Sequence, residues 1–73
     1  MAYKELGKRI YKARKNLDMT MKELGEKVKL HESTIKRYEN GEIKTLDIEK
    51  IKEFSKALKV SPINLMGWEE DDE

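Results

Sequence analysis

The side chains best suited to chemistry in this sequence are hydrogen-bonding groups that recur at helical spacing within residues 31–40. They fall on the side of a predicted helix opposite Ile35 and Tyr38, whose spacing places both in the core. Carboxylate, hydroxyl, ammonium and guanidinium groups all hydrogen-bond base edges in the major groove of B-DNA. We therefore predict base contacts from one helix face, which carries Glu32, Ser33, Lys36 and Arg37.

Each member of this set admits a second interpretation. Lys36 and Arg37 are also typical of ordinary solvated cations on a helix surface. Glu32 is explained equally well as a cytosine contact and as an acid at a helix N-terminus, where the helix dipole favours negative charge. The Ser33 hydroxyl can bond either kind of base or a phosphate. Polar side chains around the same helix suit the DNA backbone, the lysines as cations and the others as neutral hydrogen-bonding groups. The predicted phosphate contacts are Thr20, Lys22, His31, Asn40, Lys44 and Thr45.

Residue types exclude several other chemistries. The chain has no cysteine and one histidine, so it offers no disulfide, no thiolate site and no histidine cluster for a metal. Glu32 and Ser33 directly follow His31, and helix neighbours one and two positions apart point away from one another. These three side chains therefore form no catalytic dyad. We predict no enzymatic activity, no cofactor, no metal and no small-molecule ligand.

Composition predicts one small domain with a basic body. The chain has 73 residues, of which 42% are charged and 37% hydrophobic, which leaves room for one thin core. No apolar run is long enough for a membrane span or a signal peptide, so we expect a cytoplasmic protein. The predicted base and phosphate contacts would make it nucleoid-associated. The net charge of +1 hides an asymmetry, because residues 69–73 are all acids and the sixteen Lys and Arg face only ten acids before them. That excess of cations, with a run from Lys8 to Lys15, suggests a polyanion as partner.

The apolar pattern predicts five helices and no strand. Residues 4–16 carry the first helical stripe. Thr20 begins the second helix, with Glu23 completing a capping box. The third ends at Asn40-Gly41, where glycine supplies a left-handed backbone. Residues assigned to the core of these helices are Leu6, Ile10, Ala13, Leu17, Leu24, Val28, Ile35 and Tyr38.

The remaining two helices follow the same logic. Asp47 caps the fourth, and the fifth begins at Ser61-Pro62, with a hydroxyl at the cap and proline where no amide is needed. Gly67 ends it. The inward side of the fourth helix is predicted to comprise Ile48, Ile51, Phe54, Ser55 and Leu58.

The connection between the second and third helices is the most informative spacing. Only two or three residues, around Lys29-Leu30, separate them. So short a connection makes two helices cross steeply rather than lie antiparallel. The third helix then has the dimensions and the support to enter a major groove.

Two stretches resemble a known family. The sequence TMKELGEKVKLHESTIKRYENG at residues 20–41, followed by AL-x-VS at residues 57–61, is similar to the helix-turn-helix regulators of the phage repressor and Cro type. The resemblance covers residues 4–67. It implies a compact five-helix, lambda-repressor-like domain over residues 1–67, with an acidic tail or the start of a linker at 68–73. It also implies that Arg14 and Glu39 form a partly buried ion pair tying the first helix to the third.

The sequence departs from the family at several positions. Met21 stands where the family usually has a glutamine that contacts a phosphate, which weakens the case for one contact. Asp18, Lys29 and Lys59 replace turn glycines, which predicts positive φ at non-glycine residues, at a cost of up to about 1 kcal/mol each. Gly25 replaces the usual alanine where the two motif helices pack closest.

The resemblance implies a sequence-specific, double-stranded DNA-binding transcription regulator, in the first place a repressor. Two copies are expected on a palindromic operator, as a weak homodimer that DNA strengthens. The alternative is a protein-interaction module of the same fold, antitoxin-like or a partner of another regulator, with secondary DNA binding; Met21 favours it. The expected contacts between subunits are Ile63, Met66 and Trp68.

Overall fold

The computed structural model describes residues 2–67, which form five α-helices and no strand. The helices are α1 (Ala2–Asn16), α2 (Met21–Val28), α3 (Glu32–Glu39), α4 (Ile48–Leu58) and α5 (Pro62–Met66). The predicted all-α, five-helix class is confirmed. In the described part of the chain, no helix combines the length and the apolar character needed to cross a membrane.

Three of the helices begin at the predicted capping residues Thr20, Asp47 and Ser61. The Thr20 hydroxyl accepts a hydrogen bond from the Glu23 amide at 3.0 Å, and the Glu23 carboxylate accepts one from the Thr20 amide at 2.8 Å. Asp47 accepts hydrogen bonds from two amides in the first turn of α4. The Ser61 hydroxyl accepts from an amide of α5, whose first position is Pro62. Side chains therefore satisfy backbone donors that the helices themselves leave unpaired.

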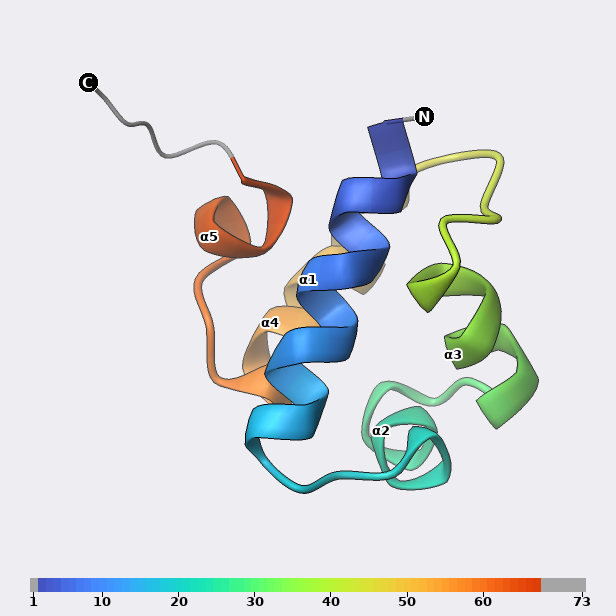
Figure 1. The fold of residues 1–73 in the computed structure, drawn as a ribbon, viewed down its shortest axis with the longest axis vertical. Coiled ribbons are helices and arrows are strands. Elements are labelled where there is room, and N and C mark those ends of the chain that lie inside the picture. The colour runs from blue at the N-terminus through green and yellow to red at the C-terminus, as the bar shows by residue number, and fades with distance from the viewer. Residues whose placement is uncertain (1, 68–73) are drawn as a thin grey trace.

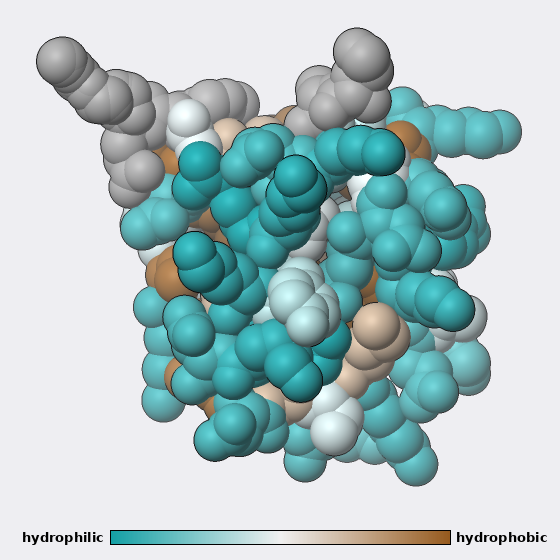
Figure 2. All heavy atoms as spheres, viewed as in Figure 1, coloured by the Kyte–Doolittle hydropathy of each residue, from teal (hydrophilic) through white to brown (hydrophobic). Residues whose placement is uncertain are grey.

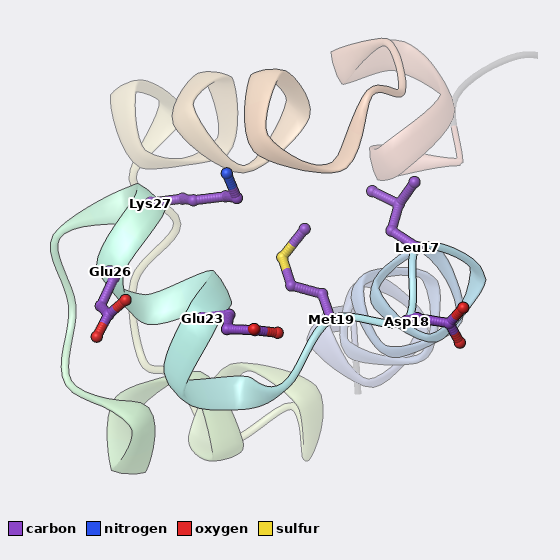
Figure 3. Close-up of a pocket in the computed structure, with 6 residues that line it drawn as sticks. All are labelled: Leu17, Asp18, Met19, Glu23, Glu26 and Lys27. Atoms are coloured by element: carbon purple, nitrogen blue, oxygen red, sulfur yellow. The ribbon is translucent and has the colours of Figure 1, made fainter.

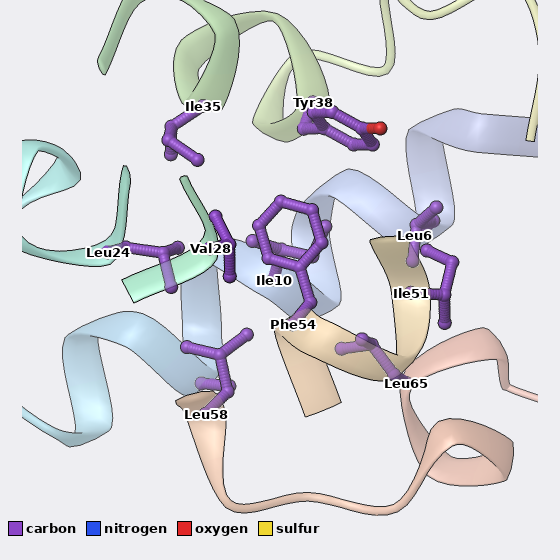
Figure 4. Close-up of a cluster of buried hydrophobic side chains, with 11 residues drawn as sticks. Leu6, Ile10, Leu24, Val28, Ile35, Tyr38, Ile51, Phe54, Leu58 and Leu65 are labelled. Carbon is purple, nitrogen blue, oxygen red and sulfur yellow. The ribbon is translucent and has the colours of Figure 1, made fainter. Parts of the chain in front are cut away.

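The core lies between α1 and α4 and is closed by the three shorter helices. Figure 1 shows α1 crossing the middle of the molecule in front of α4, with α5 on one side and α3 on the other. Phe54 is fully buried among these helices, and its ring lies 4.9 Å from that of Tyr38 at a tilt of 60°, a favourable aromatic arrangement (Figure 4). The buried apolar set is Leu6, Ile10, Ala13, Leu24, Val28, Ile35, Tyr38, Ile51, Phe54, Leu58 and Leu65.

Two apolar residues that the sequence assigned to the core lie outside it. Leu17 is 37% exposed because α1 ends at Asn16, and a turn closed by the Leu17 amide on the Arg14 carbonyl breaks the helical periodicity. Ile48 is 49% exposed because it is the first residue of α4. Helical side chains lean toward the N-terminus, so a side chain at the first position projects past the helix end. The buried stripe of α4 begins at Ile51 instead.

Three turns use a left-handed backbone without glycine, as the departures from the family predict. The φ angles are 53° at Asp18, 61° at Lys29 and 60° at Lys59. Lys29 closes α2 and Lys59 closes α4. A lysine in this region costs about 1 kcal/mol relative to glycine, so these turns are held by the packing around them.

Candidate nucleic-acid interface

The candidate interface is built on the close packing of α2 and α3. Three residues separate the two helices, and the second of them, Leu30, places its carbonyl against Gly25 of α2. A methyl group at Gly25 would overlap that carbonyl, and Ile35 of α3 lies next to the same point. The side chain of Ile35 in α3 therefore packs on the backbone of α2 at Gly25, and the two helices cross at a steep angle (Figure 1).

The α3 helix has one buried and one exposed side. Ile35 and Tyr38 are buried, and burial raises the pKa of the Tyr38 hydroxyl. In residues 2–67 no carboxylate lies within 4.0 Å of the Lys36 or Arg37 cation, so neither charge is neutralised by an ion pair there. All four residues predicted to read bases are brought together on the exposed side: Glu32, Ser33, Lys36 and Arg37.

A buried ion pair fixes the far end of α3 to α1. Arg14 Nε donates to Glu39 Oε2 at 2.6 Å and Arg14 Nη2 donates to Glu39 Oε1 at 3.1 Å, with side chains only 7% and 4% exposed. Arg14 Nη1 also donates to the Met19 carbonyl at 2.8 Å. The hydrogen bond to Glu39 is the main reason that the pKa of Arg14 rises above its ordinary value. The pair implied by the resemblance is confirmed, and it orients α3 without contacting the exposed face.

The start of α3 holds an arrangement that the sequence did not predict in detail. His31 is the N-cap, as a helix-start residue, and its Nδ1 accepts from the Ser33 amide at 3.0 Å. Because Nδ1 accepts that bond, the neutral imidazole carries its proton on Nε2. Nδ1 also lies 2.9 Å from the Ser33 hydroxyl, which can donate to it. Nδ1 has a single lone pair, so it can accept from the hydroxyl only by sharing that lone pair with the amide, whereas the Nε2–H of His31 is free to donate.

The residues predicted to contact phosphates lie at the start of α2, at both ends of α3 and in the loop that follows. The Thr20 hydroxyl accepts from the Glu23 amide and keeps its own proton free to donate. Asn40 is the C-cap of α3, and Gly41 follows with φ of 75°. All six predicted residues have exposed side chains: Thr20, Lys22, His31, Asn40, Lys44 and Thr45.

Two residues that support the interface were missed by the sequence reasoning. Lys50 of α4 donates from Nζ to the Val28 carbonyl at 2.9 Å, at the end of α2, and pairs with Glu53 at 2.9 Å. Gly7 of α1 packs so closely on the Tyr38 and Glu39 carbonyls that a methyl group there would overlap them. A lysine among other polar residues of α4 gives no sequence signal for such a role. The Gly7 contact is visible only once α1 and α3 are placed together.

The other predicted positions have mixed outcomes. Met21 is half-buried and packs against the core, so it is not a surface group like the family glutamine. Ile63 of α5 is 53% exposed, as expected of a residue outside the core. Met66 is half-buried and packs in part against the core, and its predicted contact with a second subunit stays a prediction. Trp68 lies outside the described residues.

The remaining surface is largely hydrophilic. Figure 2 shows polar side chains over most of one face, with apolar spots that stay small and separate. A depression between α2 and the turn after α1 is drawn in Figure 3. It is lined by Leu17, Asp18, Met19, Glu23, Glu26 and Lys27. Three acids against one lysine make this depression a poor place for a phosphate, so it does not extend the candidate interface.

Comparison with known proteins agrees with this geometry. A helix-turn-helix family model matches residues 10–65. The fold resembles the clp gene regulator ClgR from C. glutamicum, with a TM-score of 0.84 and 21% identity over 90% of this chain and 83% of that one. It also resembles ComR from Streptococcus suis, with a TM-score of 0.76 and 25% identity over 97% of this chain. The chain spans 23% of ComR. A sequence comparison with curated proteins finds no significant match.

The family match covers most of the chain and includes α2, α3 and the turn between them. The buried Arg14–Glu39 pair and the exposed polar side of α3 lie within it. The chain belongs to the helix-turn-helix family of the phage repressor and Cro type, whose members are DNA-binding transcription regulators.

Proposed function

We propose that this domain binds one double-stranded DNA sequence by inserting α3 into the major groove, and that it acts as a repressor. The observation that carries the proposal is the exposed side of α3, where four hydrogen-bonding side chains project from a helix whose opposite side is buried. The Arg14–Glu39 pair holds that helix in one orientation. A rigid helix of this kind suits base reading, because little ordering is needed on binding.

The roles of the individual side chains follow from their donors and acceptors. Arg37 and Lys36 suit guanine, which presents two acceptors in the major groove. The Ser33 hydroxyl can donate or accept, so it suits either kind of base or a phosphate. The Nε2–H of His31 and the hydroxyl of Thr20 are free to donate to phosphates, alongside the cations of Lys22 and Lys44 and the polar side chains of Asn40 and Thr45.

Two copies of the domain are proposed to bind a palindromic operator. A single domain offers one short helix to the groove, and one helix reads too few base pairs for specificity in a genome. Two α3 helices about 34 Å apart would lie in successive major grooves on one side of the duplex. The exposed Ile63 is the proposed centre of the contact between copies.

Selection of bound sequences from a pool of random DNA duplexes tests base recognition directly, because a domain that contacts specific bases enriches one sequence motif. Arg37→Ala should then weaken binding to that motif by about 1–3 kcal/mol and relax one or two positions. Lys44→Ala is the matched control on the phosphate side. It should weaken binding to all sequences and reduce the salt slope by about one ion.

Two results would count against the proposal. Equal losses for both variants on the motif and on random duplex would mean that α3 does not read bases. Binding that does not depend on salt, or no enrichment at all, would favour the protein-interaction module, for which a half-buried Met21 in place of a surface amide is the supporting observation.

A further inference from the structure

A second group of cations lies on the side of α1 that faces α5, away from the candidate DNA interface. Two adjoining depressions define it, one lined in part by Arg9, Lys12 and Asn64 and the other by Glu5, Lys8, Arg9 and Lys12. Positions 9 and 14 are about 140° apart around an α-helix, so Arg9 faces α5 while Arg14 faces α3. We call Lys8, Arg9 and Lys12 the α1–α5 cationic surface. The proposed DNA contacts make no use of it.

Arg9 is incompletely paired within the described residues. Its Nη1 donates to the Asn64 carbonyl at a long 3.3 Å, and the nearest carboxylate, that of Glu5, lies 3.8 Å from Nε. Arg9 Nε is shielded from solvent and has no hydrogen-bond partner in residues 2–67. A buried donor without an acceptor is costly, and a carboxylate is the best acceptor for a guanidinium. The Nε atom itself is covered, but the Arg9 side chain is 37% exposed, so the rest of the guanidinium can take one more acidic group.

The backbone leaves α5 directly beside this guanidinium. Gly67 has φ of 74°, and a Cβ atom there would lie 2.9–3.0 Å from Arg9 Nε, Cζ and Nη2. The next residues in the sequence are Trp68 and then five acids at 69–73. An extended chain advances about 3.3–3.6 Å per residue, so the first acid can reach Arg9 and the last can reach about 20 Å from Gly67. Lys8 and Lys12 are only about 6 Å apart along the helix axis.

We infer that the acidic segment 69–73 binds the α1–α5 cationic surface, with its carboxylates paired to Arg9, Lys12 and Lys8. Three observations favour the acidic segment as the partner of this surface: its charge is opposite to that of the surface, the chain after Gly67 is long enough to reach it, and Arg9 is incompletely paired. The contact would neutralise the cations on the side of α1 away from α3. A polyanion would then meet uncompensated positive charge mainly around α3. The inference does not depend on the proposed function, because the contact is within one chain.

Trp68 gives a direct measurement, since it is the only tryptophan in the chain and immediately precedes the acids. Acrylamide quenching of its fluorescence should be weak at low ionic strength and should rise as sodium chloride screens the contact. Neutralising the segment (Glu69→Gln, Glu70→Gln, Asp71→Asn, Asp72→Asn, Glu73→Gln) should raise quenching at low salt and remove its salt dependence. Lys12→Glu should do the same. Circular dichroism confirms that each variant is folded.

Lys56→Glu is the matched control, because it changes net charge equally at an exposed lysine of α4. It should leave quenching as in the unchanged chain. Equal effects of Lys56→Glu and Lys12→Glu on quenching would mean that only the net charge of the protein matters and that the segment has no specific contact with α1. Quenching that responds to none of the changes would mean that the segment does not bind α1.

Random-sequence duplex provides a second measurement. Neutralising the segment should free up to three cations and steepen the salt slope of binding by about two to three, at ~0.9 per phosphate contacted. Adding Lys12→Glu to that variant should make the salt slope shallower again by about one, whereas adding Lys56→Glu should leave the slope unchanged. An unchanged slope on neutralisation, or the same recovery from both lysines, would overturn the inference.

Discussion

At the scale of single residues, the Arg14–Glu39 pair is the contact on which the orientation of α3 most depends. Both side chains are almost fully buried, and three nitrogens of the guanidinium have acceptors inside the protein. A buried pair of this kind adds little net stability compared with apolar packing, but loss of one partner leaves the other charge buried and unpaired. Its energetic importance is therefore tested by breaking it.

Glu39→Ala should lower the free energy of unfolding by on the order of 3 kcal/mol, because Arg14 is left without its carboxylate. Arg14→Ala and Glu39→Ala together should cost less than the sum of the single changes. Urea denaturation of the four proteins gives the coupling. Glu42→Ala, an exposed acid nearby, is the control and should change stability by less than about 0.5 kcal/mol. Strictly additive single costs would mean that the pair is not coupled.

His31 permits a test of a single cap. His31→Ala removes the Nδ1 acceptor for the Ser33 amide and should destabilise the protein by about 1 kcal/mol. His31→Asn supplies a different acceptor at the same position and should restore most of that loss. Thermal melts compare the three proteins. A His31→Asn protein as unstable as His31→Ala would show that imidazole bulk, rather than the cap, matters at this position.

At the scale of elements, the contact between α2 and α3 decides how the motif is held. Gly25 lies in the middle of α2, where alanine would normally favour the helix by about 1 kcal/mol. Here the Leu30 carbonyl occupies the space that a methyl group would need, and backbone cannot move aside as a flexible side chain can. Packing therefore outweighs helix propensity at this position.

Gly25→Ala should accordingly destabilise the protein, by about 1–3 kcal/mol, despite the better helix former. The matched control is an exposed position of the same helix, Lys27→Ala, which should be neutral or slightly stabilising. Denaturant midpoints measured for both variants show whether each change stabilises or destabilises the protein. A Gly25→Ala protein more stable than the original would mean that the turn at Leu30 adjusts freely.

The sequence predicts the helices well, and it predicts a side chain's surroundings poorly where they come from another helix. Capping chemistry at Thr20, Asp47 and Ser61 located three helix starts, because a cap and its amides are close in sequence. Periodicity misplaced Leu17 and Ile48, since a period holds only while the helix continues and a neighbour covers the face.

In the candidate site, too, some features could be predicted from the sequence and others depend on contacts between helices. The exposed side of α3 was predictable from residue spacing, because the buried side fixes which residues face outward. The contact from Lys50 to the Val28 carbonyl was not, because it joins residues 22 positions apart in two different helices. The Nδ1 bond of His31 needed the local backbone geometry, which residue type alone does not give.

At the scale of the whole molecule, the proposed assembly of two copies would depend on a small apolar area. Ile63 is exposed on the five-residue helix α5, and Met66 is partly covered by the core. A helix this short can bury far less surface area than a stable protein–protein interface needs. Two copies should therefore associate weakly in the absence of DNA. Duplex then raises their effective concentration by holding them side by side.

Ile63→Lys should therefore abolish cooperative binding to a palindromic site while leaving the fold intact, because the side chain lies outside the core. Ile48→Lys is a close control: an isoleucine of similar exposure, 49% against 53%, on α4 instead of α5. It should leave cooperativity unchanged. Sedimentation of the free protein should show mostly monomer at micromolar concentration. A tight dimer, or binding that is one-to-one and non-cooperative, would contradict this assembly.

The cations of Arg14 and Lys50 hold the Met19 and Val28 carbonyls, just before α2 and at its end. Both α2 and α3 have eight residues, too few to persist as isolated helices in water. Neither helix can then detach from α1 and α4 and remain ordered. Backbone amides in α3 should exchange with deuterium only when the whole domain unfolds, and at the same limiting free energy as amides in α4. The duplex would meet a recognition helix that was already complete before contact.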